Sequence, residues 1–133
     1  MSELLEKARS YEAKKIAATD KESKPLFHIS APAGWINDPN GFSVYNGKIH
    51  LFYQYYPYLR EWGPMHWGHS TTSDMIKWEQ LPCVLAPDEE YDKKGCFSGS
   101  AIEADGKHVL VYTGVTRIKL PDGSEQERQN QCI

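Results

Sequence analysis

The sequence has 133 residues, of which 40% are hydrophobic and 25% charged, a composition that is ordinary for a globular domain. The formal net charge of -3 provides no basic footprint, which argues against nucleic-acid binding and against a basic membrane-binding face. No apolar stretch approaches the roughly 20 residues that a membrane-spanning helix needs, so we expect no membrane partner.

Residues 2 to about 18 have the pattern of an α-helix. Ser2 is a suitable N-cap, and two glutamates follow it in the first turn, where the helix dipole favours negative charge. Apolar side chains recur at helical spacing at Leu4, Ala8 and Tyr11. A polar stretch follows, so we divide the chain into a helical segment with its linker, residues 1–24, and a second unit, residues 25–133.

The second unit shows short strands separated by tight turns. Asn46-Gly47 is a strong signal for a two-residue hairpin turn and joins predicted strands at 42–45 and 48–55. Asp105-Gly106 marks a second hairpin. Further strands are predicted at 66–73, 78–84, 97–103, 108–114 and 128–133. With no helix between them, these strands predict an all-β architecture, and because the sequence stops inside the last strand we expect a fragment.

The cysteines and histidines carry no metal signature. The three cysteines are odd in number and form no C-x-x-C pair, so neither a disulfide framework nor a thiolate zinc site is expected, and a reducing, cytoplasmic location fits best. His66 and His69 are three apart on a predicted strand, which places them on opposite faces. We assign neither a metal nor a cofactor.

Residues 35–41, Trp-Ile-Asn-Asp-Pro-Asn-Gly, are the most informative stretch. Pro39 favours an extended backbone at Asp38, and the Asn-Gly pair after it tolerates positive φ. This pattern predicts a carboxylate held on a stiff, sharply turning segment just before the first hairpin, with asparagines able to hydrogen-bond beside it. Such fixed geometry suits a nucleophile, although the same residues are also typical of a plain surface turn.

Four segments in order resemble glycoside hydrolase family 32, which holds invertases, sucrose-6-phosphate hydrolases, inulinases and levanases. The first segment is residues 35–41. The others are Leu-Phe-Tyr-Gln-Tyr-Tyr-Pro at 51–57, Trp-Gly-Pro-Met-His-Trp-Gly-His at 62–69 with Ser-Asp at 73–74, and Cys-Phe-Ser-Gly-Ser-Ala at 96–101. The matching region runs from about residue 27 to residue 133.

The resemblance implies a retaining β-fructofuranosidase that hydrolyses terminal β-fructofuranosides through a covalent fructosyl-enzyme. Asp38 would be the catalytic nucleophile, and a fructoside sugar would be the partner. The implied fold is a five-bladed β-propeller, of which this chain would form the first blade and most of the second. The residues implied to bind substrate are Trp35, Asn37, Gln54, Trp62, Phe97 and Ser98.

The chain departs from the family in its second carboxylate. The family's Arg-Asp-Pro motif, with a transition-state aspartate, and its Glu-Cys motif, with the acid/base, do not occur here. We therefore predict that the chain holds part of a site and does not turn over substrate alone. The alternative is a non-catalytic carbohydrate-binding or assembly module that self-associates through open strand edges.

Overall fold

The structure, a computed structural model, describes residues 2–133. Within them the chain forms one α-helix, one short 3-10 helix and seven strands. In chain order the elements are α1 (Glu3–Ala18), η1 (Lys21–Ser23), β1 (Trp35–Tyr45), β2 (Lys48–Tyr56), β3 (His66–Thr72), β4 (Glu79–Leu85), β5 (Gly95–Ala104), β6 (Lys107–Lys119) and β7 (Glu125–Cys132).

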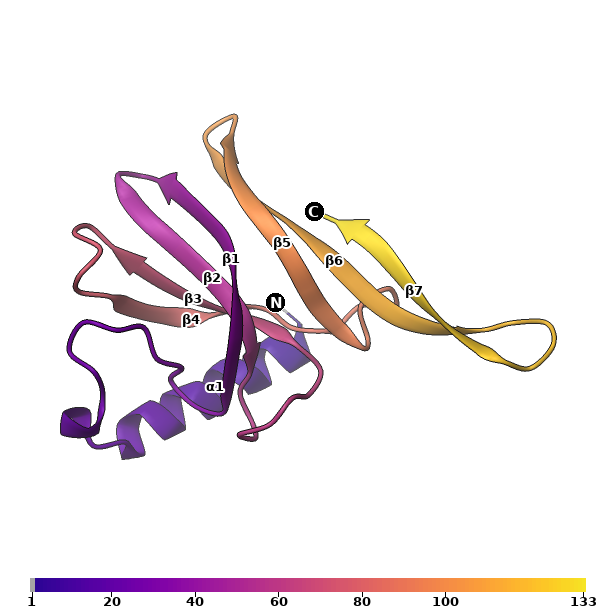
Figure 1. Cartoon of the computed structure of the whole chain (residues 1–133), viewed down its shortest axis with the longest axis horizontal. Coiled ribbons are helices and arrows are strands. Elements are labelled where there is room, and N and C mark those ends of the chain that lie inside the picture. Colours follow the sequence, from indigo (N-terminus) through magenta and orange to yellow (C-terminus); the bar gives the residue numbers. More distant parts are fainter. Residues whose placement is uncertain (1) are drawn as a thin grey trace.

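The strands form two antiparallel sheets, ordered β1-β2-β3-β4 and β5-β6-β7. Figure 1 shows the sheets beside each other, with β1 of the first next to β5 of the second. The expected all-β class is confirmed in the coarser sense that the fold is mostly β with one N-terminal α-helix. The two sheets formed by residues 2–133 do not close into a propeller.

Both predicted hairpins are present. Asn46 and Gly47 have φ of 47° and 71°, and Asp105 and Gly106 have φ of 50° and 71°. Two successive residues with positive φ match the right-handed twist of the flanking strands, which explains why Asn-Gly and Asp-Gly occur there. All the predicted strands are found. β1, β2, β5 and β6 extend beyond their predicted bounds, β3 and β4 differ from theirs by one residue, and the strand predicted at 128–133 spans Glu125–Cys132.

The expectation of a turning segment before the first hairpin was wrong. β1 begins at Trp35, so the Trp-Ile-Asn-Asp-Pro-Asn-Gly stretch lies within a strand, in which Trp35, Ile36, Pro39 and Asn40 pair with β2. The pairing shifts register twice, between Ile36 and Pro39 and between Asn40 and Ser43. These bulges accommodate a proline, which has no N–H to donate, within a strand.

The faces of β2 are both covered, which explains its almost continuous apolar sequence. Alternation places Tyr53 and Tyr55 in a core with Ala8 of α1, whereas Phe52 belongs to the core between the two sheets. In that second core Trp67 is fully buried and donates its indole N–H to the carbonyl of Phe97, with a nitrogen–oxygen distance of 3.2 Å. The sheets are therefore packed together as one unit.

Helix α1 begins at its predicted N-cap, because the Ser2 side chain accepts the Leu5 N–H. It packs against β4, the last strand of the first sheet. The Glu12 carboxylate accepts the Cys83 N–H at 3.0 Å, and Arg9 donates to the Cys83 carbonyl at 2.7 Å. Two helix side chains thus satisfy backbone groups at a sheet edge. Among residues 2–133, no helix combines the length and apolar character needed to cross a membrane.

Candidate active site

The bulge in β1 places Asp38 beside two other residues predicted for the site. Ile36 pairs with Tyr55 and Pro39 with Tyr53, so Asn37 and Asp38 together lie opposite the single residue Gln54. A bulge of this kind re-aims side chains that regular pairing would send to alternate faces. Both bulge residues are exposed, whereas Gln54 is buried. The Asp38 carboxylate accepts no hydrogen bond from a described residue and is open to an incoming molecule.

Asn40 connects the first motif to the last. Its side-chain oxygen accepts the N–H of Gly99 at 3.3 Å, and its side chain is buried. Gly99 follows Ser98, so this bond joins β1 to the Phe-Ser-Gly-Ser segment at the start of β5. The sequence motifs did not identify Asn40 as a link between strands.

Close packing around β1 and β5 depends on glycine at two positions. A Cβ at Gly41 would lie 2.7 Å from the Phe52 ring and 3.1 Å from the Ala101 Cβ, and the residue has φ of +51°. A Cβ at Gly99 would lie 2.1 Å from the Val111 carbonyl oxygen. Neither position has room for a side chain. Gly41 lets β1 lie against Phe52 and Ala101, and Gly99 lets the backbones of β5 and β6 approach closely.

An aromatic ring of a loop and one of a strand meet near this junction. Trp62, in the loop between β2 and β3, contacts Phe97 of β5 in a T-shaped arrangement with ring centroids 6.4 Å apart. About half of Trp62 is exposed, at 52%, and Ser98 beside Phe97 is also exposed. An exposed indole backed by a second ring is suited to covering an apolar face of a sugar.

Three N–H donors on residues of the motifs are buried and have no acceptor among the described residues. They belong to the indole of Trp35 and to the side-chain amides of Asn40 and Gln54. A buried donor without a partner costs about 1–3 kcal/mol, so such groups concentrate where another molecule or segment supplies the acceptor. Trp35 and Gln54 were both predicted to bind substrate.

Glu89 and Glu90, in the loop before β5, are exposed to solvent. Asp92 behaves differently, because it is buried and accepts the Tyr112 hydroxyl at 2.8 Å and the Glu89 N–H at 2.8 Å. Burial raises the pKa of the Asp92 carboxyl above its ordinary value. Its contacts with Tyr112 place it in the core, so it organises the loop before β5.

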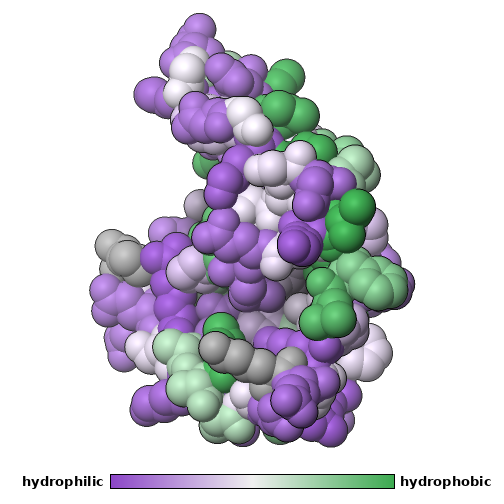
Figure 2. Space-filling model, turned by 90° about the vertical axis from the view of Figure 1, so that its left-hand side faces the viewer, coloured by the Kyte–Doolittle hydropathy of each residue, from purple (hydrophilic) through white to green (hydrophobic). Residues whose placement is uncertain are grey.

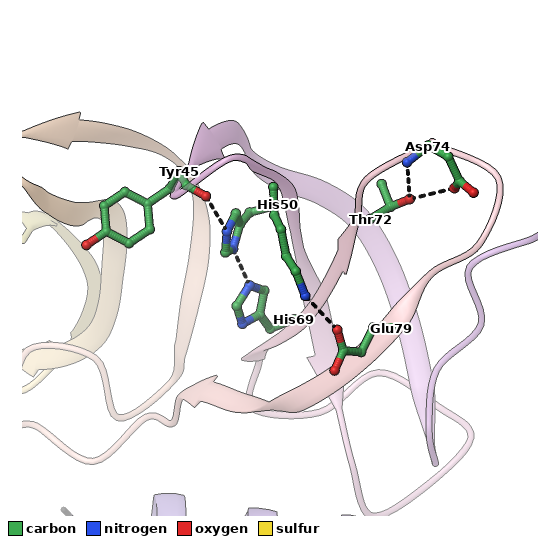
Figure 3. A network of polar contacts seen from close by, with 7 residues as sticks. Tyr45, His50, His69, Thr72, Asp74 and Glu79 are labelled. Atoms are coloured by element: carbon green, nitrogen blue, oxygen red, sulfur yellow. Dashed lines mark hydrogen bonds and ion pairs between the residues drawn. The ribbon is translucent and has the colours of Figure 1, made fainter.

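The structure also reveals a histidine cluster that the sequence patterns missed. His50 Nδ1 lies 2.9 Å from His69 Nε2, and the other His50 nitrogen lies 3.2 Å from the Tyr45 carbonyl oxygen (Figure 3). His108 joins from β6, with its Nε2 2.9 Å from the Ser43 hydroxyl. Burial lowers the pKa of His69 to about 4, with the neighbouring His50 adding to the effect. His50 and His69 are diagonal neighbours when β2 pairs with β3, so a predicted pairing of these two strands could have identified them.

His66 lies outside this cluster. Its Nδ1 is 2.8 Å from the Pro64 carbonyl oxygen, and burial lowers its pKa to about 4. Over residues 2–133, no group of three or more His, Cys, Asp or Glu side chains is arranged to hold a metal ion. The three cysteines are free and buried, and burial raises the pKa of the Cys83 and Cys96 thiols.

Comparison with known proteins gives one family. Residues 28–133 match the model of the glycosyl hydrolases family 32 N-terminal domain. The sucrose-6-phosphate hydrolase of Escherichia coli is 49% identical over 109 residues, which are 82% of this chain and 23% of that protein. The levanase of Bacillus subtilis strain 168 is 48% identical over 99 residues, which are 74% of this chain and 14% of that protein.

A solved structure of the same family has the same arrangement. The Bombyx mori β-fructofuranosidase superposes with a TM-score of 0.78 at 46% identity, covering 95% of this chain and 26% of that one. A mutant of the Bombyx mori enzyme in complex with sucrose gives the same TM-score at 45% identity. The chain thus spans about a quarter or less of the length of the relatives it matches.

Proposed function

Because the chain belongs to glycosyl hydrolase family 32, we propose that it supplies the nucleophile side of an active site for terminal β-fructofuranosides such as sucrose or sucrose 6-phosphate. The observation that carries the proposal is the bulge that sets Asn37 and Asp38 opposite Gln54. The relatives named above as a sucrose-6-phosphate hydrolase, a levanase and a sucrose-bound β-fructofuranosidase mutant support this substrate class.

In the proposed reaction the Asp38 carboxylate attacks the anomeric carbon of the fructosyl unit. An acid protonates the leaving oxygen, and the resulting covalent fructosyl-enzyme is hydrolysed when the same group activates water. Retaining enzymes of this kind hold their two carboxyl groups about 5–5.5 Å apart. The bulge contributes a fixed position for the nucleophile, and its exposure leaves a path for the sugar.

The remaining predicted residues would bind and orient the sugar. Trp62, backed by Phe97, offers an apolar surface for the ring, and the Ser98 hydroxyl lies on the adjoining residue. Gln54 offers an unpaired amide donor across from the bulge. Hydrogen bonds to hydroxyls and contact with an aromatic face are the two interactions by which proteins bind sugars without charge.

We assign the acid/base to none of the carboxylates of this chain, because the Glu-Cys motif does not occur in it. Asp92 is occupied by Tyr112 and the Glu89 N–H, and Glu12 by the Cys83 N–H. The proposal is therefore that the acid/base belongs to a segment outside these 133 residues and that the residues alone do not hydrolyse sugar. The two sheets would be the first blade and most of the second blade of a five-bladed propeller, with the site where β1 and β5 lie side by side. A cytoplasmic location stays a prediction.

The test replaces Asp38 with asparagine in a full-length enzyme that carries this sequence. Asp38→Asn keeps the size of the side chain but removes the nucleophile, so sucrose hydrolysis should fall by at least about 10³-fold while the folded content by circular dichroism is unchanged. The matched control is Asp105→Asn at an exposed hairpin turn, which should retain activity. Retention of most of the activity by Asp38→Asn would remove the nucleophile assignment.

One observation favours the alternative of a binding or assembly module. β7 is the last strand of the second sheet and has no further strand beyond it among residues 2–133. An uncovered strand edge is a template for pairing with another chain. Calorimetric titration with fructose and sucrose, together with sedimentation of the purified 133 residues, tests this function. Sucrose turnover by those residues alone would contradict both the module and the assignment of the acid/base to another segment.

A further inference from the structure

A cationic pocket lies at the C-terminal end of α1, away from the histidine cluster. It has a volume of about 290 Å³ and is formed by three segments, namely α1 with the residue after it, the stretch that leads into β1, and the loop after β2. Its lining includes Tyr11, Lys15, Lys24, Gly34, Tyr58 and Arg60. Figure 2 shows the side of the molecule on which the C-terminal end of α1 lies, and most of that surface is hydrophilic.

Three cations and no carboxylate line the pocket. Lys15 and Arg60 are exposed and Lys24 is half-buried. Among the described residues none of the three forms an ion pair, whereas Lys48, Lys93, Lys94 and Arg117 do so elsewhere. Like charges gathered around one cavity repel each other, and the partial burial of Lys24 removes some of its hydration. The pocket is therefore set up electrostatically for an anion.

Packing of the surrounding residues gives the pocket a defined shape. The Tyr11 hydroxyl donates to the Tyr58 carbonyl at 3.2 Å, and the two rings lie edge to face with centroids 5.2 Å apart. The Lys15 ammonium lies over the Tyr11 ring, 5.4 Å from its centroid. Gly34 has φ of +61°, and a Cβ there would lie 2.1 Å from the Tyr56 carbonyl oxygen. Aromatic contacts and this close approach hold the three segments together.

The pocket adjoins the proposed active site through two chain segments. Gly34 directly precedes the first residue of β1 and is four residues before Asp38, so their Cα atoms are at most about 14 Å apart. Arg60 is two residues before Trp62 in the same loop. A molecule in the pocket would therefore lie at the same end of β1 as the nucleophile.

We propose that this pocket binds the phosphate group of a phosphorylated sugar. A phosphate monoester carries close to two negative charges near neutral pH and offers three acceptor oxygens, which suits a pocket lined by three cations and no carboxylate. Arginine binds such a group with two parallel hydrogen bonds, and lysines add point charges. The phosphate belongs either to the substrate itself, in which case the inference rests on the proposed function, or to a separate sugar phosphate that binds beside it.

Binding is measured first, in a form that is independent of hydrolysis. A full-length protein carrying Asp38→Asn is titrated by calorimetry with glucose 6-phosphate, inorganic phosphate and glucose at low and moderate salt. Glucose 6-phosphate and phosphate should bind, with affinity that falls as salt rises, and glucose should bind at least about tenfold more weakly than its phosphate. Equal binding of glucose and glucose 6-phosphate would overturn the proposal.

Substitutions locate the binding in the pocket. Lys24→Gln and Arg60→Gln should each weaken glucose 6-phosphate binding at least about tenfold, because each removes a charge-assisted hydrogen bond. The matched control is Lys14→Gln, which removes a lysine of the same helix that does not line the pocket. Circular dichroism checks that each variant is folded. Unchanged affinity in the Lys24→Gln, Arg60→Gln double variant would also overturn the proposal.

Hydrolysis then separates the two sources of phosphate. If the phosphate is the substrate's own, Lys24→Gln in the active enzyme raises KM for sucrose 6-phosphate at least about tenfold and leaves KM for sucrose unchanged. If it belongs to a separate molecule, glucose 6-phosphate alters sucrose hydrolysis in the parent and not in Lys24→Gln. Either result supports the pocket. If neither sugar is hydrolysed, the proposed function fails. The titrations still show whether the pocket binds phosphate.

Discussion

The side-chain oxygen of Asn40 accepts the backbone N–H of Gly99 at 3.3 Å, across 59 residues of sequence and between the two sheets. Through this bond the strand that carries Asp38 is held against the strand that carries Ser98. Asn40 is buried, and so its position is set by packing on both sides. We regard it as a positioning residue, because it acts on the site through the strands it joins.

Replacement of Asn40 by alanine tests this link. The variant leaves the Gly99 N–H without its acceptor, so the free energy of unfolding should decrease by about 1–3 kcal/mol. Urea denaturation measures the change, with Gln126→Ala on the exposed part of β7 as the control. In a full-length enzyme, KM for sucrose should rise because Ser98 is no longer fixed relative to Asp38. A loss of stability without any change in KM would show that Asn40 is structural alone.

Gly99→Ala should be more damaging than its small size suggests. The added Cβ would lie 2.1 Å from the Val111 carbonyl oxygen and 2.6 Å from the Tyr112 Cα, both of which are backbone atoms that cannot rotate away. Overpacking against backbone costs about 1–3 kcal/mol or more, because β5 and β6 must separate locally. Thermal unfolding compared with Ser100→Ala, an exposed position on the same strand, measures the effect. Equal stability of the two variants would contradict the packing argument.

The sequence was sufficient to predict the strands and hairpins but not the bulge. Asn46-Gly47 and Asp105-Gly106 require positive φ locally, so their residue types alone indicate a turn. Residues 37–41 contain equally good turn formers, yet they lie within β1, where Pro39 and Asn40 pair with β2. Only the partner strand decides between a turn and a strand. The motif therefore identified the nucleophile candidate, and the structure corrected how it is held.

Contacts between segments far apart in the sequence could not be predicted, because they depend on how the sheets pack. The Asn40–Gly99 bond and the approach of His108 to His50 both depend on how one sheet packs on the other. Within a hairpin the pairing register is fixed by the turn, whereas no local rule fixes the register between sheets. The cationic pocket is of the same kind, since its cations come from three separate segments.

Glu12 gives a prediction about pH. Burial raises the pKa of its carboxyl above the ordinary 4.5, although the hydrogen bond from Cys83 acts in the opposite direction. A carboxyl with a raised folded-state pKa contributes stability that is present below pH 4.5 and is lost as the pH rises through the folded-state pKa. Glu12→Gln keeps an acceptor for the Cys83 N–H but does not ionise. The variant should therefore be more stable than the parent at neutral pH.

The measurement for Glu12 is urea denaturation at several pH values between 4 and 8. The difference in free energy of unfolding between Glu12→Gln and the parent should increase with pH, and other titrating groups cancel because both proteins contain them. Glu12→Ala, which offers no acceptor to Cys83, is the comparison and should be less stable than Glu12→Gln throughout. A difference that does not change with pH would show that Glu12 is charged to the same extent in both states.

His69 gives a prediction of the opposite sign. Its pKa is lowered by burial from 6.5 to about 4, so the folded protein holds it neutral between these values while the unfolded chain binds a proton. Stability is therefore lost as the pH falls from 6.5 towards 4, by on the order of 3 kcal/mol for this one group. His69→Gln should flatten that part of the stability curve. Parallel curves for the parent and His69→Gln would contradict the assignment.

Substitutions of Trp62 and Trp67 should have different effects, one on sugar binding and the other on stability. Trp67 is fully buried between the sheets, so Trp67→Ala should lower the free energy of unfolding by about 3–5 kcal/mol. Trp62 is 52% exposed, and Trp62→Ala should cost much less stability because most of its surface already meets solvent. Its loss should instead weaken fructoside binding, seen as a rise of at least about tenfold in KM for sucrose in a full-length enzyme. If Trp62→Ala left KM unchanged, the indole would not be part of the sugar site, and Phe97 behind it would lose its proposed role as well.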